Sequence, residues 1–315
     1  MLAAVADRYG PPDVVSVREV PRPTPRADQV LVQVASTAVN SSDARIRGAR
    51  FPSGFGVPAR LALGVRRPRR SILGSCFSGV VAAVGAEVQG TEPGDEVCGM
   101  TGAAMGAHAE FVAAPTRALA AKPPEVGHDD AAGLLFGATT ASYFLRDRAT
   151  VSAGAQVLVN GASGAVGTNA VQLAAHLGAT VTGVASTANL ALVERLGADH
   201  VIDHTRHDPV ETTERFDVIF DTVGTLPLAA ARHLLRPDGV LLLAVAGLGT
   251  TVWPRGNVVT GTAPERADDI RFLLSLVADG TLVVVHDALL GLDDIVAAHE
   301  RVDSGHKVGN VVVRP

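Results

Sequence analysis

The sequence predicts an α/β protein that combines a doubly wound parallel sheet with a second, β-rich domain. Three observations support this fold class. From about residue 155 onward, apolar runs typical of buried strands alternate with amphipathic helical patterns, as in sheets covered by helices on both faces. A glycine-rich turn joins the first of these strands to the first helix. Residues 1 to about 120 instead contain short strand-like runs separated by turns, which favours a small barrel.

The composition is that of an ordinary globular protein. The chain has 315 residues, of which 47% are hydrophobic and 19% charged, and this length suggests about two domains. The net charge of −5 gives no reason to expect a nucleic acid partner. Two cysteines are too few for a disulfide framework or a four-cysteine zinc site. Since no apolar run reaches the ~18 residues of a membrane helix and no signal peptide is recognisable, we expect a cytoplasmic protein without a membrane partner.

Local patterns place the first strands and a domain junction. Residues 30–36 alternate apolar and polar side chains, as a half-buried strand does. Residues 44–72 are punctuated by glycine, and we expect them to be rich in loops that border a pocket. Two prolines precede Asp129, which we expect to cap a helix over about 131–145. The change of pattern at this point indicates a junction between domains.

The second half of the chain alternates strands and helices. The expected strands are residues 156–161, 179–186, 200–204, 216–223 and 240–247, and the expected helices are about 165–177, 189–197 and 227–239. The remainder is expected to contain an edge strand at 257–263, a helix at 265–280, an apolar run at 281–286, a helix at 293–302 and a terminal strand at 310–315. Because an unpaired edge invites a partner, we expect a homodimer that forms through residues 257–263.

The turn within residues 157–167, VLVNGASGAVG, has the composition of a phosphate-binding turn. Its helix begins at the carboxyl end of a parallel strand, where free backbone N–H groups and the helix dipole favour an anion. Gly164 lets a pyrophosphate approach the backbone, and Gly167 lets the helix lie close to the strand. Relative to the usual G-x-G-x-x-G pattern, Ala162 replaces the first glycine. The alternative is a glycine turn that only packs well. We predict a Rossmann dinucleotide-binding domain whose cofactor contacts are Gly161, Ser163, Gly164, Ala165, Val166 and Gly167.

The end of the second parallel strand indicates which nucleotide is bound. An acidic residue here usually binds the ribose hydroxyl of NAD. The sequence instead supplies Ser186, Thr187 and Asn189, and no carboxylate. This removes repulsion against a 2′-phosphate and provides hydroxyl and amide donors, so NADPH is favoured over NADH. His204, at the end of the third strand, either approaches the same phosphate or is an ordinary surface residue.

Several motifs in a fixed order resemble the medium-chain dehydrogenase/reductase superfamily, and within it the zinc-free quinone oxidoreductase branch. They are VASTAVNSSD, GDEV, GASGAVGTNAVQLAAHLGA, VERLGADHVID and SGHKVGNVVV, and they cover nearly the whole chain. The resemblance implies a GroES-like β-rich domain with a Rossmann domain inserted before its last part. The division that follows is 1–122 for the GroES-like substrate domain, 123–264 for the Rossmann domain and 265–315 for the return to the GroES-like domain.

The superfamily contains zinc alcohol dehydrogenases as well as zinc-free reductases, and the residues at the zinc-ligand positions distinguish them. The resemblance places Asn40, Ser75 and Phe136 at those positions. None of these side chains replaces a thiolate or an imidazole, and Cys76, one residue away, would be a lone ligand. The cysteine-rich loop of a structural zinc site is also missing. We therefore predict no metal.

Without a metal, reduction of an activated double bond is easier than oxidation of an alcohol, because charge delocalises onto a substrate oxygen. The resemblance puts Asn40 beside the nicotinamide, where its amide would donate to that oxygen, and puts Thr140 at the cofactor cleft. Lys307 lies near the return to the first domain, within possible reach of the cofactor. Alternatively, Asn40 is only a turn residue, Thr140 only packs within its helix, and Lys307 is only a solvated lysine. Val223 and Val245 end parallel strands and are placed to line the nicotinamide.

The sequence thus predicts an NADPH-dependent, zinc-independent reductase that transfers hydride to a quinone or an α,β-unsaturated carbonyl. We find no side-chain acid for the final proton, which water would then supply. One alternative is a non-catalytic NADPH-binding sensor or structural protein on the same scaffold. A second is an enoyl thioester reductase.

Overall fold

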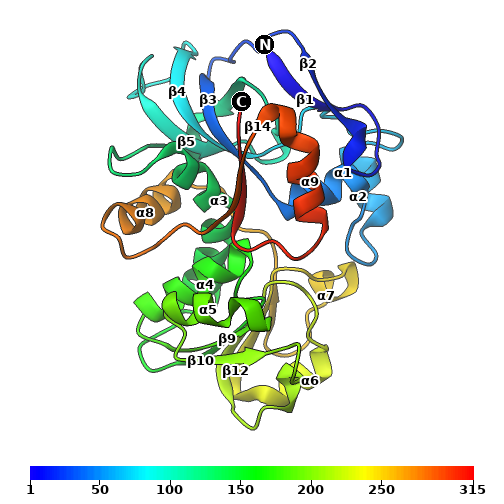
Figure 1. The fold of residues 1–315 in the computed structure, drawn as a ribbon, viewed down its shortest axis with the longest axis vertical. Coiled ribbons are helices and arrows are strands. Elements are labelled where there is room, and N and C mark those ends of the chain that lie inside the picture. Colours follow the sequence, from blue (N-terminus) through cyan, green and yellow to red (C-terminus); the bar gives the residue numbers. More distant parts are fainter.

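The computed structural model describes all 315 residues. Two large sheets lie in different halves of the molecule (Figure 1). The first half contains a seven-stranded sheet of order β14-β15-β3-β4-β5-β7, with β6 paired to β3, and a small β1-β2 ribbon. Its strands are β1 (Leu2–Ala6), β2 (Val15–Glu19), β3 (Gln29–Val39), β4 (Cys76–Val84), β5 (Glu96–Met100), β6 (Phe111–Pro115), β7 (Leu119–Ala121), β14 (His286–Gly291) and β15 (Asn310–Arg314). This is the β-rich domain that the sequence predicts.

The second half is a six-stranded parallel sheet of order β10-β9-β8-β11-β12-β13. Its strands are β8 (Gln156–Asn160), β9 (Thr180–Ala185), β10 (His200–Asp203), β11 (Phe216–Asp221), β12 (Leu235–Leu243) and β13 (Val258–Thr260). Val157 and Val159 belong to one hydrophobic cluster, whereas Leu158 between them belongs to another. Alternate side chains of β8 therefore enter cores on opposite faces, as expected for a sheet buried on both sides.

Helices cover both faces of this sheet. They include α3 (His128–Ser142), α4 (Ala165–His176), α5 (Leu190–Arg195), α6 (Leu228–Leu234) and the short α7 (Leu248–Val252). In Figure 1, α3 lies between the two halves of the molecule, and α4 and α5 lie beside β9 and β10. The expected helix after the glycine turn is confirmed within one residue at its end.

The chain returns to its first half before it ends. Helix α8 (Ala267–Ala278) lies against α3 and β7, and α9 (Ile295–Asp303) lies against β15 and α1 (Ser41–Gly48). Strand β15 pairs antiparallel with β3, with Val311 opposite Val39. Strands β14 and β15 thus belong to the sheet of the first half, and the domain division at 122/123 and 264/265 stays a prediction. None of the helices is both long and apolar enough to cross a membrane.

Three local predictions were wrong. The N-cap of α3 is Gly127, and Asp129 lies in the first turn, where its carboxylate accepts from Ser36 Oγ at 2.6 Å. Residues 44–72 contain most of α1 and all of α2 (Gly56–Leu63) rather than loops alone. The helix expected over 227–239 ends at Leu234, because β12 starts at the next residue. The apolar run at 281–286 contains no strand before His286, and its Val283 N–H donates to Gln172 Oε1 on α4 at 2.8 Å.

Candidate functional site

A groove runs along the carboxyl ends of the parallel strands and consists of three adjoining hollows. The nucleotide groove (640 Å³) contains Ser163, Ser186 and His204. The junction cavity (440 Å³) shares Gly164 and Lys307 with it. The inner cavity (690 Å³) lies between the two halves and shares several residues with the junction cavity, namely Ser41, Arg45, Phe136, Val166 and Thr222. These volumes suit small-molecule ligands, and this edge of a parallel sheet is where such ligands bind.

The glycine turn lies where the nucleotide groove meets the junction cavity. Gly161 has a φ of +79°, a left-handed conformation that favours glycine, and a β-carbon there would lie 2.7 Å from Thr222 Oγ1. Gly164 is the N-cap of α4, and a β-carbon on it would meet only the Gly161 carbonyl oxygen at 3.5 Å. A β-carbon on Gly167 would lie 2.0 Å from that same oxygen. Gly164 thus leaves open space on the ligand side, whereas Gly167 allows the close approach of helix and strand.

The predicted nucleotide contacts fall on the groove with two exceptions. Gly161, Ser163, Gly164, Ser186, Asn189, His204, Val223 and Lys307 line the nucleotide groove, and Ala165 and Val166 line the junction cavity. The Asn189 amide donates to Ser163 Oγ at 3.3 Å and to Ser186 Oγ at 3.2 Å, which ties the ends of β8 and β9 together. Gly167 lies beneath the turn, outside these hollows. The hydroxyl of Thr187 donates to Asp203 instead of lining the groove.

Sequence reasoning missed Asp203, which brings a carboxylate next to the end of β9. Asp203 ends β10 and accepts from Thr187 Oγ1, from Thr205 Oγ1 at 2.6 Å and from the Thr205 N–H at 3.0 Å. These hydrogen bonds lower the pKa of Asp203 to about 2, so the group is a carboxylate at neutral pH. Its oxygens are occupied by protein donors. The pairing of parallel β9 and β10 could have indicated this neighbour, because their carboxyl ends meet at one edge.

The return segment also contacts the glycine turn. The Gly309 N–H donates to the Ser163 carbonyl at 2.8 Å, and Gly309 and Gly164 form an isolated parallel bridge. Lys307 lines both the nucleotide groove and the junction cavity, and its ammonium donates to the Gly309 carbonyl at 2.5 Å. Burial lowers the pKa of Lys307 to about 8. The C-terminal segment therefore supplies a cation beside the turn.

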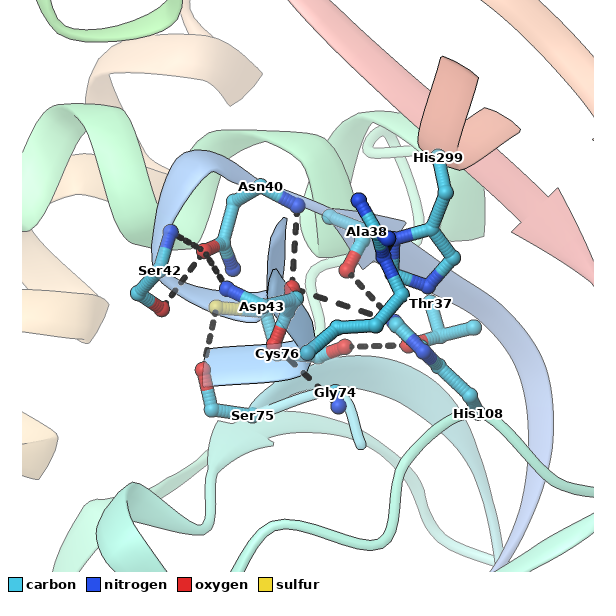
Figure 2. Close-up of polar contacts among 11 residues, drawn as sticks. Thr37, Ala38, Asn40, Ser42, Asp43, Gly74, Ser75, Cys76, His108 and His299 are labelled. Carbon is cyan, nitrogen blue, oxygen red and sulfur yellow. Dashed lines mark hydrogen bonds and ion pairs between the residues drawn. The ribbon is translucent and has the colours of Figure 1, made fainter. Parts of the chain in front are cut away.

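The predicted catalytic residue Asn40 is the N-cap of α1 (Figure 2). Its Oδ1 accepts from the Ser42 N–H at 2.8 Å, the Ser42 hydroxyl at 2.7 Å and the Asp43 N–H at 3.3 Å. Asp43 completes a capping box, because its carboxylate accepts from the Asn40 N–H at 2.9 Å. Asn40 is 3% exposed, and its Nδ2 has no hydrogen-bond partner. Its chain neighbours Ser41 and Ser42 line the inner cavity, whereas Asn40 lies just behind the wall.

A buried polar cluster supports this helix end. Asp43 is fully buried and also accepts from the Gly74 N–H at 3.2 Å, while His108 Nε2 lies 3.9 Å from its carboxylate (Figure 2). Burial raises the pKa of Asp43, and the neighbouring His108 opposes that shift. His299 contacts His108 edge-on and accepts from Arg47 Nε at 3.4 Å. The cluster fixes the start of α1 at the edge of the inner cavity.

The remaining predicted residues lie around the inner cavity or beside it. Thr140 lines the cavity, but its hydroxyl donates to the Phe136 carbonyl at 2.8 Å, so it faces a ligand as an acceptor. Val245 lines the inner cavity, and Val223 lies at the junction with 45% of its surface exposed. Asp221 accepts from the N–H groups of Val223 and Gly224, which fixes the loop that carries Val223.

Comparisons with known proteins agree with this architecture. A family model described as alcohol dehydrogenase GroES-like domain matches residues 26–124, and one described as zinc-binding dehydrogenase matches residues 196–313. The NADPH-dependent alkenal/one oxidoreductase of Arabidopsis thaliana is 31% identical, over 100% of this chain and 80% of its own length. The chain belongs to the medium-chain dehydrogenase/reductase superfamily.

Two further members of the medium-chain dehydrogenase/reductase superfamily extend the comparison. The 2-methylene-furan-3-one reductase of Solanum lycopersicum is 30% identical over 98% of this chain and 77% of its own length. The solved structure of the quinone oxidoreductase from Coxiella burnetii superposes with a TM-score of 0.90 at 27% identity, covering 100% of this chain and 99% of the other. The predicted superfamily and fold class are thereby confirmed.

The superfamily's zinc site does not fit the residues of this chain. Ser75 and Phe136 line the inner cavity and Asn40 adjoins it, so the three positions do come together. Their side chains offer a hydroxyl, a phenyl ring and an amide. No group of three or more His, Cys, Asp or Glu side chains that could hold a metal ion exists in the structure. Burial also raises the pKa of the Cys76 thiol well above its usual range, which disfavours a thiolate ligand. We therefore assign no reaction step to zinc.

Three charged residues of the inner cavity were not anticipated. Glu265 lines it together with Arg117, and burial raises the pKa of Glu265. Arg45, on α1, lines both the inner and the junction cavities. The three residues come from distant segments of the chain, and only the folded arrangement brings them to one cavity.

Proposed function

We propose that the protein is an NADPH-dependent, zinc-independent reductase that transfers hydride to a quinone or an α,β-unsaturated carbonyl. The observation that carries this proposal is the continuous groove from the glycine turn to an inner cavity without a metal-binding set of side chains. The names of the relatives support it, since they include an NADPH-dependent alkenal/one oxidoreductase and a quinone oxidoreductase.

The cofactor would lie along the groove with its pyrophosphate at the start of α4. Gly164 leaves the space, the N–H groups of the first turn of α4 donate, and Lys307 adds a positive charge. Ser163, Ser186, Asn189 and His204 offer neutral donors at the nucleotide end. The oxygens of Asp203 already accept from hydroxyl and backbone donors, so they are not free to accept from a ribose 2′-hydroxyl as the carboxylate of an NAD site does.

When bound, NADPH supplies the hydride that adds to the β-carbon of the acceptor. The electron pair of the double bond then moves toward the carbonyl oxygen, where negative charge develops and must be stabilised. The structure offers two donors near the start of α1, the hydroxyl of Ser41 and the unpaired Nδ2 of Asn40, whereas the Ser42 hydroxyl already donates to Asn40 Oδ1. Water supplies the proton that completes the reaction. Thr140, Val223 and Val245 orient the two rings rather than exchange protons.

Two further features belong to this proposal. Strand β13 is the unpaired edge of the parallel sheet, and Val252 and Trp253 just before it are 50% and 73% exposed. We infer that this edge forms a homodimer, because exposed apolar side chains and an open strand edge both favour association. A cytoplasmic location is likewise part of the proposal.

The test is consumption of NADPH with a panel of quinones and alkenals, before and after treatment with a chelator. We expect oxidation with at least one acceptor and no loss of rate after chelation. Binding of NADPH without oxidation by any acceptor would favour a non-catalytic sensor or structural protein. Oxidation with enoyl thioesters alone would favour an enoyl thioester reductase, and loss of activity on chelation would contradict zinc independence.

A further inference from the structure

Arg45 is a partly buried arginine whose guanidinium has no partner in the protein. It lies on α1, and its side chain lines both the junction cavity and the inner cavity. Burial lowers its pKa, and no neighbouring carboxylate opposes that shift. The next two arginines behave differently, because Arg47 and Arg50 both pair with Asp303. Arg45 is therefore the one of these three cations that faces a cavity without a counter-charge.

Such an arrangement favours a ligand that completes it, because the half-buried guanidinium is partly withdrawn from water and has no acceptor in the protein. A guanidinium that loses water on burial must recover its hydrogen bonds from another group, or the folded state bears the cost. Its planar fork of donors matches a carboxylate or a phosphate and binds it through two parallel hydrogen bonds. An oxyanion is accordingly the ligand that would match the Arg45 guanidinium best.

The charged side chains around the two cavities also favour an anionic ligand. Arg45 and Arg117 line the inner cavity against a single carboxylate, Glu265, which is close enough to Arg117 for that cation to lower its pKa. In the junction cavity, Arg50 is neutralised by Asp303. Since the whole chain carries a net charge of −5, a cavity with an excess of cations is a local feature and favours anionic ligands.

We propose that Arg45 binds a carboxylate carried by the acceptor, so that the preferred substrates are enones or quinones that bear a carboxylate group. This inference rests on the proposed reductase function. The phosphates of the cofactor have other donors, at the start of α4 and at Lys307. Of the cations that line the junction cavity, Arg45 alone also lines the inner cavity, beside the apolar Phe136, Met100 and Val245. An acceptor would thus place its hydrocarbon part on these side chains and its carboxylate on the guanidinium.

The experiment compares two acceptors of the same shape, 4-oxopent-2-enoate and hex-3-ene-2,5-dione, in which an acetyl group replaces the carboxylate. We expect the wild-type protein to have the higher kcat/KM for the keto acid. Arg45→Met keeps an unbranched, flexible side chain without the charge and should lower kcat/KM for the keto acid by about 10- to 100-fold, since a charge-assisted hydrogen bond is lost. The value for the diketone should stay within about threefold. Arg45→Lys should restore part of the preference.

Two controls make the result specific. Arg195→Met removes a cation from the exposed face of α5 and should leave kcat/KM for both acceptors unchanged. Thermal unfolding checks that Arg45→Met is folded, and Arg45→Gln serves as a second variant if it is not. The affinity for NADPH, measured by fluorescence titration, should be unchanged in Arg45→Met. A loss of NADPH affinity with equal losses for both acceptors would mean that Arg45 binds a cofactor phosphate, and would overturn the proposal.

A binding measurement separates this proposal from the reductase function. Calorimetric titration with 4-oxopentanoate, the saturated keto acid, requires no turnover. Binding to the wild-type protein that is lost in Arg45→Met supports the carboxylate site even if no acceptor oxidises NADPH. Turnover of the diketone with no preference for the keto acid, and no binding of 4-oxopentanoate, would leave the reductase function standing and overturn the carboxylate site.

Discussion

Gly167 faces the carbonyl oxygen of Gly161 so closely that a β-carbon on Gly167 would lie 2.0 Å from it. Gly164, between them, has only that oxygen nearby, at 3.5 Å. The two glycines therefore have different roles. Gly167 allows the helix to lie against the strand, and Gly164 keeps the ligand side open.

Alanine substitution separates these roles. Gly167→Ala should destabilise the protein by about 3 kcal/mol, because backbone atoms must move apart. Gly164→Ala should cost about 1 kcal/mol or less and yet weaken NADPH binding at least about tenfold, since the methyl group occupies the space for the pyrophosphate. Chemical denaturation and fluorescence titration measure the two effects. Equal NADPH affinity in Gly164→Ala and wild type would contradict the placement of the pyrophosphate.

The cap and the proposed donor of Asn40 are different atoms of one side chain. Asn40→Ser keeps an oxygen that caps α1 and removes the Nδ2 donor. We expect stability within about 0.5 kcal/mol of the wild type, and a fall in kcat of about 10- to 100-fold if the amide stabilises the developing oxyanion. Asn40→Ala, which removes both groups, is the matched comparison. Full activity of the serine variant would assign Asn40 to capping alone.

Lys307 predicts a pH dependence of cofactor binding. Burial lowers its pKa to about 8, so the ammonium is present below this pH and is lost above it. Because the ammonium attracts phosphate, the Kd for NADPH should rise as the pH increases from about 7 to about 9. Lys307→Met should bind more weakly at neutral pH and show a flatter profile. If both proteins give the same profile, Lys307 does not contact the cofactor.

His299 predicts a pH dependence of stability. Burial, together with the neighbouring His108 and Arg47, lowers its pKa from 6.5 to about 2. Between these values the unfolded chain binds a proton that the folded protein does not, so the free energy of unfolding should fall as the pH decreases below about 6.5. The slope from this group is at most about 1.4 kcal/mol per pH unit. His299→Gln should reduce that slope, as measured by urea unfolding at several pH values. An unchanged slope would show that His299 is not the group responsible.

Trp253 reports on the proposed dimer, because it is the only tryptophan of the chain and is 73% exposed. Association through the β13 edge should shift its fluorescence to shorter wavelength as the protein concentration increases. Light scattering after gel filtration gives the mass independently. Val252→Glu places a charge beside Trp253 and should favour the monomer. A dimer whose Trp253 fluorescence matches that of the monomer would place the interface elsewhere.

The parallel half of the fold was predictable because its signals are local. The run from Val157 to Val159 is apolar without interruption, and the glycine spacing of the following turn fixes both the helix start and the open side. Most of the candidate groove followed from those two features. The capping box of Asn40 and Asp43 is also a local pattern, and could have predicted the start of α1.

The remainder depends on contacts between distant segments. Helix α1 has no clear apolar face, and its Arg47 is buried only because Asp303, far along the chain, pairs with it. Thr187 turns away from the groove because Asp203 of the neighbouring strand accepts its hydrogen bond. Arg45 and Glu265 reach one cavity from opposite halves of the sequence. No local periodicity in the sequence predicts such contacts between distant residues.

The hydrogen bond from the Gly309 N–H to the Ser163 carbonyl joins two residues that the ribosome adds at widely separated times during synthesis. While the ribosome is still adding residues beyond 264, the parallel sheet has all its strands, yet β3 lacks its neighbour β15 and the glycine turn lacks Gly309. The nucleotide groove is therefore complete only when this segment has been added. We expect the full stabilisation by NADPH only after residues 305–311 have left the exit tunnel, which makes complete binding of the cofactor a late event in the production of the protein.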